Sequence, residues 1–117
     1  MNTEISYDEL AKRNRLLEQT FNAVPDLILL LDKEHRIIRA NKAMADRLNR
    51  TPKALQGKRC FQIVHGTDSP PEDCPHNRLL EDGGEHCLEV FEKRLSGSFM
   101  VTVSPVPYNE KEIACVH

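Results

Sequence analysis

Two cysteines and two histidines lie close together in the middle of the chain and could act in chemistry. They are Cys60, His65, Cys74 and His76. Two thiolates and two imidazoles form the ligand set of a tetrahedral Zn²⁺ site, and they also suit other transition metals. The spacing differs from the usual close Cys-x2-Cys pair, so a bend at Pro75 would have to bring Cys74 and His76 to one metal ion. A metal centre is therefore one hypothesis for this segment.

The same cysteines allow two other interpretations. Cys60 and Cys74 form a redox pair if the fold brings their Cα atoms within about 7 Å, and otherwise they are ordinary reduced thiols. The N-terminus lacks a basic start followed by an apolar stretch, which predicts no signal peptide. We therefore expect a cytoplasmic segment with reduced cysteines, either in a soluble protein or in a membrane-anchored parent.

Motifs that carry catalysis are absent from the sequence. There is no Gly-rich phosphate loop, no Gly-x-Ser-x-Gly and no His-Glu-x-x-His. The stretch Glu34-His35-Arg36 superficially resembles a phospho-acceptor site. It falls at the start of a predicted strand rather than on a dimer helix, so we interpret it as part of a turn. We expect no enzymatic activity from this segment itself.

The charge and hydropathy of the chain bear on its partners. Its 117 residues suffice for one domain, and 16 Lys and Arg against 18 Asp and Glu leave a net charge of −2. Such a balance predicts no nucleic-acid partner and no contact with an anionic membrane. The longest apolar run, Leu27–Leu31, is far shorter than the roughly 20 residues of a membrane span, so it predicts a strand.

Residues 1–24 are predicted to form an amphipathic helix that serves as a linker and in dimerisation. A heptad pattern places Tyr7, Asn14 and Phe21 at one core position and Leu10, Leu17 and Val24 at the other. A parallel coiled coil would use Leu10, Asn14, Leu17 and Phe21. The alternative is a helix that packs on its own domain.

Residues 25–117 change character after Pro25-Asp26 and predict a domain of α+β class. The expected elements are strands 27–31 and 35–40, a helix 41–48, a helical turn 52–57, an apolar turn 60–64, a helix 76–80, and strands 85–95, 98–106 and 111–117. Five antiparallel strands with helices over one face leave a natural ligand cavity between the layers. The expected lining is Leu29, Leu31, Ile38, Met44, Phe61, Leu79, Val101 and Val103.

Several short stretches in this order resemble a PAS domain, the small sensor module of bacterial signalling proteins. They are Pro25-Asp26, Asp32, Ala40-Asn41-Lys42-Ala43, Leu55-Gln56-Gly57-Lys58 and Val103-Ser104-Pro105-Val106. The resemblance covers about residues 20–117. It implies a PAS-like five-stranded antiparallel sheet with short helices on one face and pairing through an N-terminal helix.

The cysteine-bearing segment also resembles a subgroup of PAS domains that carries a Cys, His-Gly, Cys-Pro pattern. Here the pattern is Cys60, His65-Gly66 and Cys74-Pro75, without the extra cysteine that often precedes the last pair. The residues around Cys60 depart from the flavin-binding branch, so a flavin is not expected. His76 stands where haem-binding members place an axial imidazole, but a histidine at a helix start is more commonly a solvent-exposed neighbour of the cap, so haem is not expected either.

The resemblance implies a sensory module that binds a small ligand or a partner domain and relays a signal to an attached effector. By analogy the effector is a histidine kinase of a two-component system. The chain stops at His117, inside its last expected strand, so we expect a C-terminally truncated fragment of a longer protein. Two alternatives are a metal or redox sensor at the Cys/His segment, and a purely dimerising interaction module. No cofactor is required by this interpretation.

Overall fold

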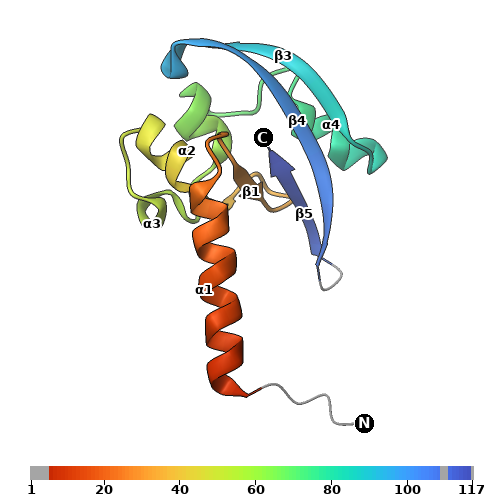
Figure 1. Ribbon diagram of the computed structural model, residues 1–117. Helices are drawn as coiled ribbons and strands as arrows, with labels where there is room; N and C mark the ends of the chain where they lie inside the picture. Colours follow the sequence, from red (N-terminus) through yellow and green to blue (C-terminus); the bar gives the residue numbers. More distant parts are fainter. Residues whose placement is uncertain (1–5, 109–110, 117) are drawn as a thin grey trace.

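The chain folds around a five-stranded antiparallel sheet with the strand order β2-β1-β5-β4-β3 (Figure 1). The computed structural model describes residues 6–108 and 111–116. The strands are β1 (Leu29–Leu31), β2 (Ile37–Ala40), β3 (His86–Glu92), β4 (Gly97–Tyr108) and β5 (Lys111–Val116). The predicted α+β class with a PAS-like five-stranded sheet is thereby confirmed.

Short helices connect the two halves of the sheet, and a longer helix precedes it. The helices are α1 (Tyr7–Ala23), α2 (Lys42–Arg47), α3 (Pro52–Leu55) and α4 (Pro75–Asp82), with a π-helical turn η1 (Phe61–His65) and a 3-10 turn η2 (Lys93–Leu95). In Figure 1, α1 extends away from the body of the domain, whereas α2, α3 and α4 lie close to the sheet. Within the described residues, no helix is both long and apolar enough to span a membrane.

Local signals in the sequence explain where these helices begin. The side chains of Ser6, Asn41 and Thr51 accept hydrogen bonds from backbone amides in the first turns of α1, α2 and α3, at 3.1, 3.1 and 3.2 Å. Such caps satisfy amides that have no partner within the helix. Pro52 and Pro75 occupy first-turn positions, where a missing amide hydrogen costs nothing.

The observed elements differ from the expected ones at several boundaries, of which three have a clear local description. Strand β2 starts at Ile37 rather than at residue 35, because His35 adopts a left-handed conformation (φ 66°) in the turn. The strand expected over 85–95 ends at Glu92, since the chain forms η2 there and Ser96 is also left-handed. The helix expected over 76–80 extends across Pro75–Asp82.

Buried apolar side chains form two clusters of different size. The larger cluster joins β1 and β2 to α2, α3, η1 and η2; its buried members are Leu29, Leu31, Ile37, Ala40, Met44, Ala45, Leu55, Val64 and Leu95. The smaller cluster has Leu79 and Val103 as its buried members. The β3–β4 side is therefore less densely filled within the part of the chain that the structure describes.

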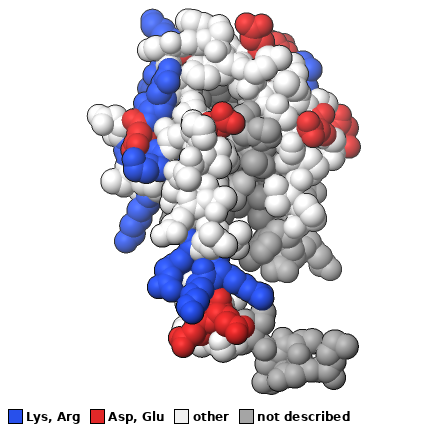
Figure 2. All heavy atoms as spheres, in the orientation of Figure 1, with Lys and Arg blue, Asp and Glu red and all other residues white. Residues whose placement is uncertain are grey.

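On the face drawn in Figure 2, lysines and arginines gather along one side of the body and on α1, while acidic residues lie at the end of α1 and mainly on the other side of the body. The acidic residues Asp8 and Glu9 lie in the first turn of α1, where negative charge complements the helix dipole. Charges of both signs therefore occur on the drawn face.

Candidate ligand cavity

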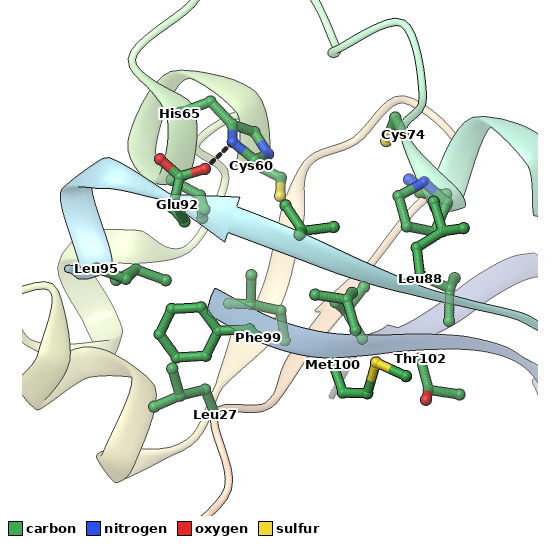
Figure 3. Close-up of a pocket in the computed structure, with 18 of the residues that line it drawn as sticks. Leu27, Cys60, His65, Cys74, Leu88, Glu92, Leu95, Phe99, Met100 and Thr102 are labelled. Atoms are coloured by element: carbon green, nitrogen blue, oxygen red, sulfur yellow. Dashed lines mark hydrogen bonds and ion pairs between the residues drawn. The ribbon is translucent and has the colours of Figure 1, made fainter. Parts of the chain in front are cut away.

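A cavity of about 870 Å³ lies between the sheet and the segments that cover its β3–β4 side. The inward side chains of the two long strands form one wall: Leu88, Val90, Phe99, Val101 and Val103. Leu29 of β1, Met44 of α2, Val64 of η1 and the start of α4 contribute other parts of the lining. Figure 3 shows Leu27, Phe99 and Leu95 toward one end, and Cys74 and Leu88 toward the other. This volume is in the range of small-molecule sites.

The strand alternation explains why these residues share one face. Leu88 pairs with Val101 and Val90 with Phe99 in the antiparallel register, so their side chains stand on the same side of the sheet. Met100, between two of them, is 67% exposed.

Four of the eight residues expected to line the cavity do so. They are Leu29, Met44, Val101 and Val103. Leu31, Phe61 and Leu79 are instead buried in packing outside the lining. Ile38 falls at an irregularity in the β1–β2 register, is only half-buried and lies outside both apolar clusters. Local patterns could not locate the irregularity at Ile38, and none of these four residues is among those that line the cavity.

All four residues of the hypothetical metal site, Cys60, His65, Cys74 and His76, line the cavity. Among the described residues, however, no three His, Cys, Asp or Glu side chains are grouped closely enough to hold a metal ion. His65 is paired with Glu92, and His76 is paired with His35. The structure therefore does not assemble the expected metal site, because each imidazole already has another partner.

Cys60 and Cys74 are free thiols in the structure. Burial raises the pKa of Cys60 to about 12, and the neighbouring Cys74 and Glu92 act in the same direction. The thiol therefore stays protonated near neutral pH, and a protonated thiol is a poor nucleophile and a poor metal ligand. Whether the two cysteines act as a redox pair stays a prediction.

The η1 edge of the cavity is fastened to η2 by polar contacts. Glu92, 8% exposed, pairs with Nδ1 of His65, as the dashed line in Figure 3 marks. Arg94 donates hydrogen bonds to the carbonyl oxygens of Gln62 and Ile63, at 3.3 and 3.1 Å. Its guanidinium lies against Gly66, where a Cβ atom would come within 2.5 Å of Nη2. These contacts hold η1 beside the end of β3.

A buried pair of imidazoles lies beside the start of α4. Nδ1 of His76 is 3.1 Å from Nδ1 of His35, and Nε2 of His35 is 2.8 Å from Oδ1 of Asn77. His76 is 2% exposed, so the expectation of a solvent-exposed histidine there was wrong. Burial, followed by the neighbouring His35, lowers the pKa of His76 to about 4, and burial also lowers the pKa of His35. Both rings are neutral at pH 7.

The helix α1 contacts the sheet face opposite the cavity. Arg39 of β2 forms an ion pair with Glu18 at 2.5 Å, and its guanidinium lies 5.4 Å from the centre of the Phe21 ring. The buried Asn41 fixes the connection to β1: its Nδ2 donates to the carbonyl oxygens of Val24 and Asp26, at 3.2 and 2.8 Å. Its Oδ1 accepts from two backbone amides, those of residues 28 and 44.

The residues expected to pair in a dimer divide into two groups. Leu10, Asn14 and Leu17 are exposed, with Leu10 at 47% and Leu17 at 67%. Phe21 is instead half-buried against Arg39 of its own domain. No residue of α1 is buried.

Comparisons with known proteins agree with this architecture. Residues 25–116 match the family model described as PAS domain, whereas no curated protein matches the chain. A PAS domain of an HTR-like protein from Haloarcula marismortui is 19% identical, with a TM-score of 0.73 and coverage of 93% of this chain and 92% of that one. The PAS domain of nitrogen regulation protein NR(II) from Vibrio parahaemolyticus is 21% identical, with a TM-score of 0.68 over 86% and 94% of the two chains. A sensory box sensor histidine kinase from Vibrio cholerae is 16% identical, with a TM-score of 0.61 over 93% and 91%. The chain belongs to the PAS domain family.

Proposed function

We propose that this PAS domain is a sensory module that binds a small molecule in the cavity and relays its occupancy to an attached effector. The observation that carries the proposal is the cavity itself, about 870 Å³, with a lining in which apolar residues outnumber the polar and charged ones. An apolar enclosure with a small number of convergent polar groups is the usual form of a ligand site. The module acts by binding and needs no catalytic group of its own.

The sheet offers a route from the cavity to α1. Leu29 lines the cavity, and its neighbour Leu30 lies with Leu17, Phe21 and Arg39 around a small hollow against α1. Consecutive residues of a strand face opposite sides of the sheet, so a shift of β1 moves both surfaces together. A ligand that binds one position of β1 better than another would thereby bias the orientation of α1.

The proposed effector is a histidine kinase of a two-component system, located in the cytoplasm. The names of two solved relatives, a nitrogen regulation protein and a sensor histidine kinase, support this choice of effector. We further propose that the module works as a homodimer paired through α1, because its leucines are exposed along the heptad seam.

The dimer is tested by two neighbouring leucines of similar exposure. Leu17 lies on the seam at 67% exposure, and Leu16 lies off it at 65%. Light scattering should show a dimer for the unmodified chain and for Leu16→Glu, but a monomer for Leu17→Glu. A monomer in all three cases would contradict pairing through α1.

Ligand binding is tested by closing the cavity. Val101→Trp fills the space from the β4 wall, whereas Ser98→Trp places the same side chain on an exposed position outside the lining. In a thermal-shift screen of small molecules, a hit should raise the unfolding temperature of the unmodified chain and of Ser98→Trp in a concentration-dependent way, and not that of Val101→Trp. If no compound in the screen stabilises the chain, the result contradicts ligand binding and favours the alternative of a purely dimerising module.

A further inference from the structure

One buried polar atom of a cavity-lining residue lacks a hydrogen-bond partner. Nε2 of His76 is buried, and among the described residues it is the only buried side-chain nitrogen or oxygen without one. The ring itself is 2% exposed and belongs to the cavity lining. Leaving a buried polar group unsatisfied is costly, so each such atom in a folded protein calls for an explanation.

The hydrogen bonds of His35 and His76 determine whether Nε2 of His76 donates or accepts a hydrogen bond. Oδ1 of Asn77 can only accept, so Nε2 of His35 carries the proton in their 2.8 Å hydrogen bond. A neutral His35 then has a lone pair on Nδ1, and Nδ1 of His76 must donate to it. A neutral His76 with its proton on Nδ1 presents a lone pair at Nε2. The free nitrogen is therefore an acceptor.

His76 is a residue of the cavity lining, and its unpartnered nitrogen is covered by neighbouring atoms. Nδ1 faces His35, which is not among the lining residues, and Nε2 lies on the other edge of the ring. The lining residues next to His76 in the chain are Asp73, Cys74, Pro75 and Arg78. Figure 3 shows Cys74 and the aliphatic Leu88 toward the same end of the pocket.

The cations of the lining already have partners. Arg47 donates to the carbonyl oxygen of Leu95 at 2.6 Å and lies over the Phe99 ring, and Arg78 pairs with Asp73 at 3.4 Å. At the His76 end, an anion would meet the lone pair of Nε2, and the cation next to it in the chain, Arg78, is already paired with Asp73. A neutral group fits this end better than a carboxylate.

We propose that the cavity selects a neutral, mainly apolar molecule that carries a hydroxyl or N–H group, and that this group donates a hydrogen bond to Nε2 of His76. The inference rests on the proposed function, because it names the ligand class of the same cavity. Since Nε2 is buried, the side chains over it must shift when the donor arrives. A ligand that donates to Nε2 therefore contacts α4 directly, because His76 belongs to this helix.

The test compares two probes of nearly equal shape, phenol and toluene, which differ in a hydroxyl group against a methyl group. Their dissociation constants are measured by NMR titration of the full chain and of His76→Phe, which keeps a ring but removes the acceptor. The ratio of toluene to phenol dissociation constants should fall by about tenfold in His76→Phe, as expected for one lost hydrogen bond. His86→Phe, at a histidine outside the lining, should leave the ratio unchanged.

The outcomes separate this inference from the proposed function. If both probes bind and the ratio is the same in the full chain and in His76→Phe, the cavity binds ligands but His76 does not select them, and the inference fails alone. If neither probe binds, both the inference and the ligand-sensing function are overturned.

A second measurement does not depend on the variant folding. Long-range ¹H–¹⁵N NMR of the unmodified chain should show His76 protonated at Nδ1 and unprotonated at Nε2, with the Nε2 resonance shifting on addition of phenol but not of toluene. A proton on Nε2 in the absence of probe would overturn the inference.

Discussion

The two ends of the sheet are built differently. The packed half comprises β1, β2, α2 and α3, where large aliphatic side chains from the sheet and the helices interlock in one buried cluster. The cavity half comprises β3, β4 and α4, where the buried apolar cluster among the described residues has only two members, Leu79 and Val103. We infer that the packed half supplies most of the stability. The cavity half can rearrange around a ligand at a small cost in free energy.

The largest expected effect on stability is that of truncating a leucine in the packed half, and a leucine of the cavity half serves as its comparison. Leu31 is 1% exposed in the packed half, so Leu31→Ala should lower the free energy of unfolding by about 2–5 kcal/mol. Leu88 borders existing space and is half-buried, so Leu88→Ala should cost about 1 kcal/mol or less. Urea unfolding measures both. Equal losses would break the distinction between the halves.

Acid should weaken the fold through His76 at the start of α4. In the unfolded chain an imidazole takes up a proton near pH 6.5, but His76 in the fold resists protonation until its pKa of about 4. The folded state therefore loses stability as the pH falls from 6.5 toward 4, by about 2–3 kcal/mol from this residue at pH 4.5.

The matching measurement is urea unfolding of the unmodified chain and of His76→Phe at pH 7.5 and pH 4.5. The acid-induced loss should be smaller in His76→Phe, and the difference between the two losses isolates this imidazole from carboxylates that titrate in the same range. Identical losses would show that His76 is not held neutral by burial.

The side-chain amide of Asn41 holds the junction between α1 and the packed half. Asn41→Ala removes four hydrogen bonds and leaves the carbonyl oxygens of Val24 and Asp26 without this donor, so the expected loss of stability is about 2 kcal/mol. Asn22→Ala, at an exposed residue whose Oδ1 accepts one bond from the Lys42 amide, should cost about 0.5 kcal/mol. Thermal unfolding compares the two, and similar losses would remove Asn41 as the anchor of the linker.

The smallest expected effect concerns the ion pair on the outer sheet face. Arg39 and Glu18 are partly exposed, so Arg39→Gln should change the free energy of unfolding by less than about 1 kcal/mol. Amide exchange in the last turn of α1 should nevertheless accelerate, while exchange in β4 stays the same. Unchanged exchange in α1 would show that the contacts of Arg39 do not hold this helix on the sheet.

Features set by local residue types could be predicted from the sequence. The caps at Asn41 and Thr51 and the alternation of Phe99, Val101 and Val103 depend on neighbours within a few positions, and the structure has them as expected. The order of several such stretches along the chain was enough to predict the PAS fold.

The candidate site depends on contacts between distant residues, which local patterns do not specify. His35 and His76 are 41 positions apart, and His65 and Glu92 are 27 apart. The cluster of thiols and imidazoles suggested a metal centre by composition, but only the fold shows that each imidazole has its own partner. No sequence signal marked His35 as a left-handed turn residue, because that conformation is uncommon for histidine.

The most direct test of the account is a two-dimensional ¹H–¹⁵N NMR titration of the full chain with phenol. The account predicts saturable shifts concentrated on amides of α4, β3, β4 and η1, with small changes in β2 and α3. Absence of saturable shifts, or shifts of equal size in both halves, would contradict the central claim that the cavity half is the ligand-binding part of this PAS domain.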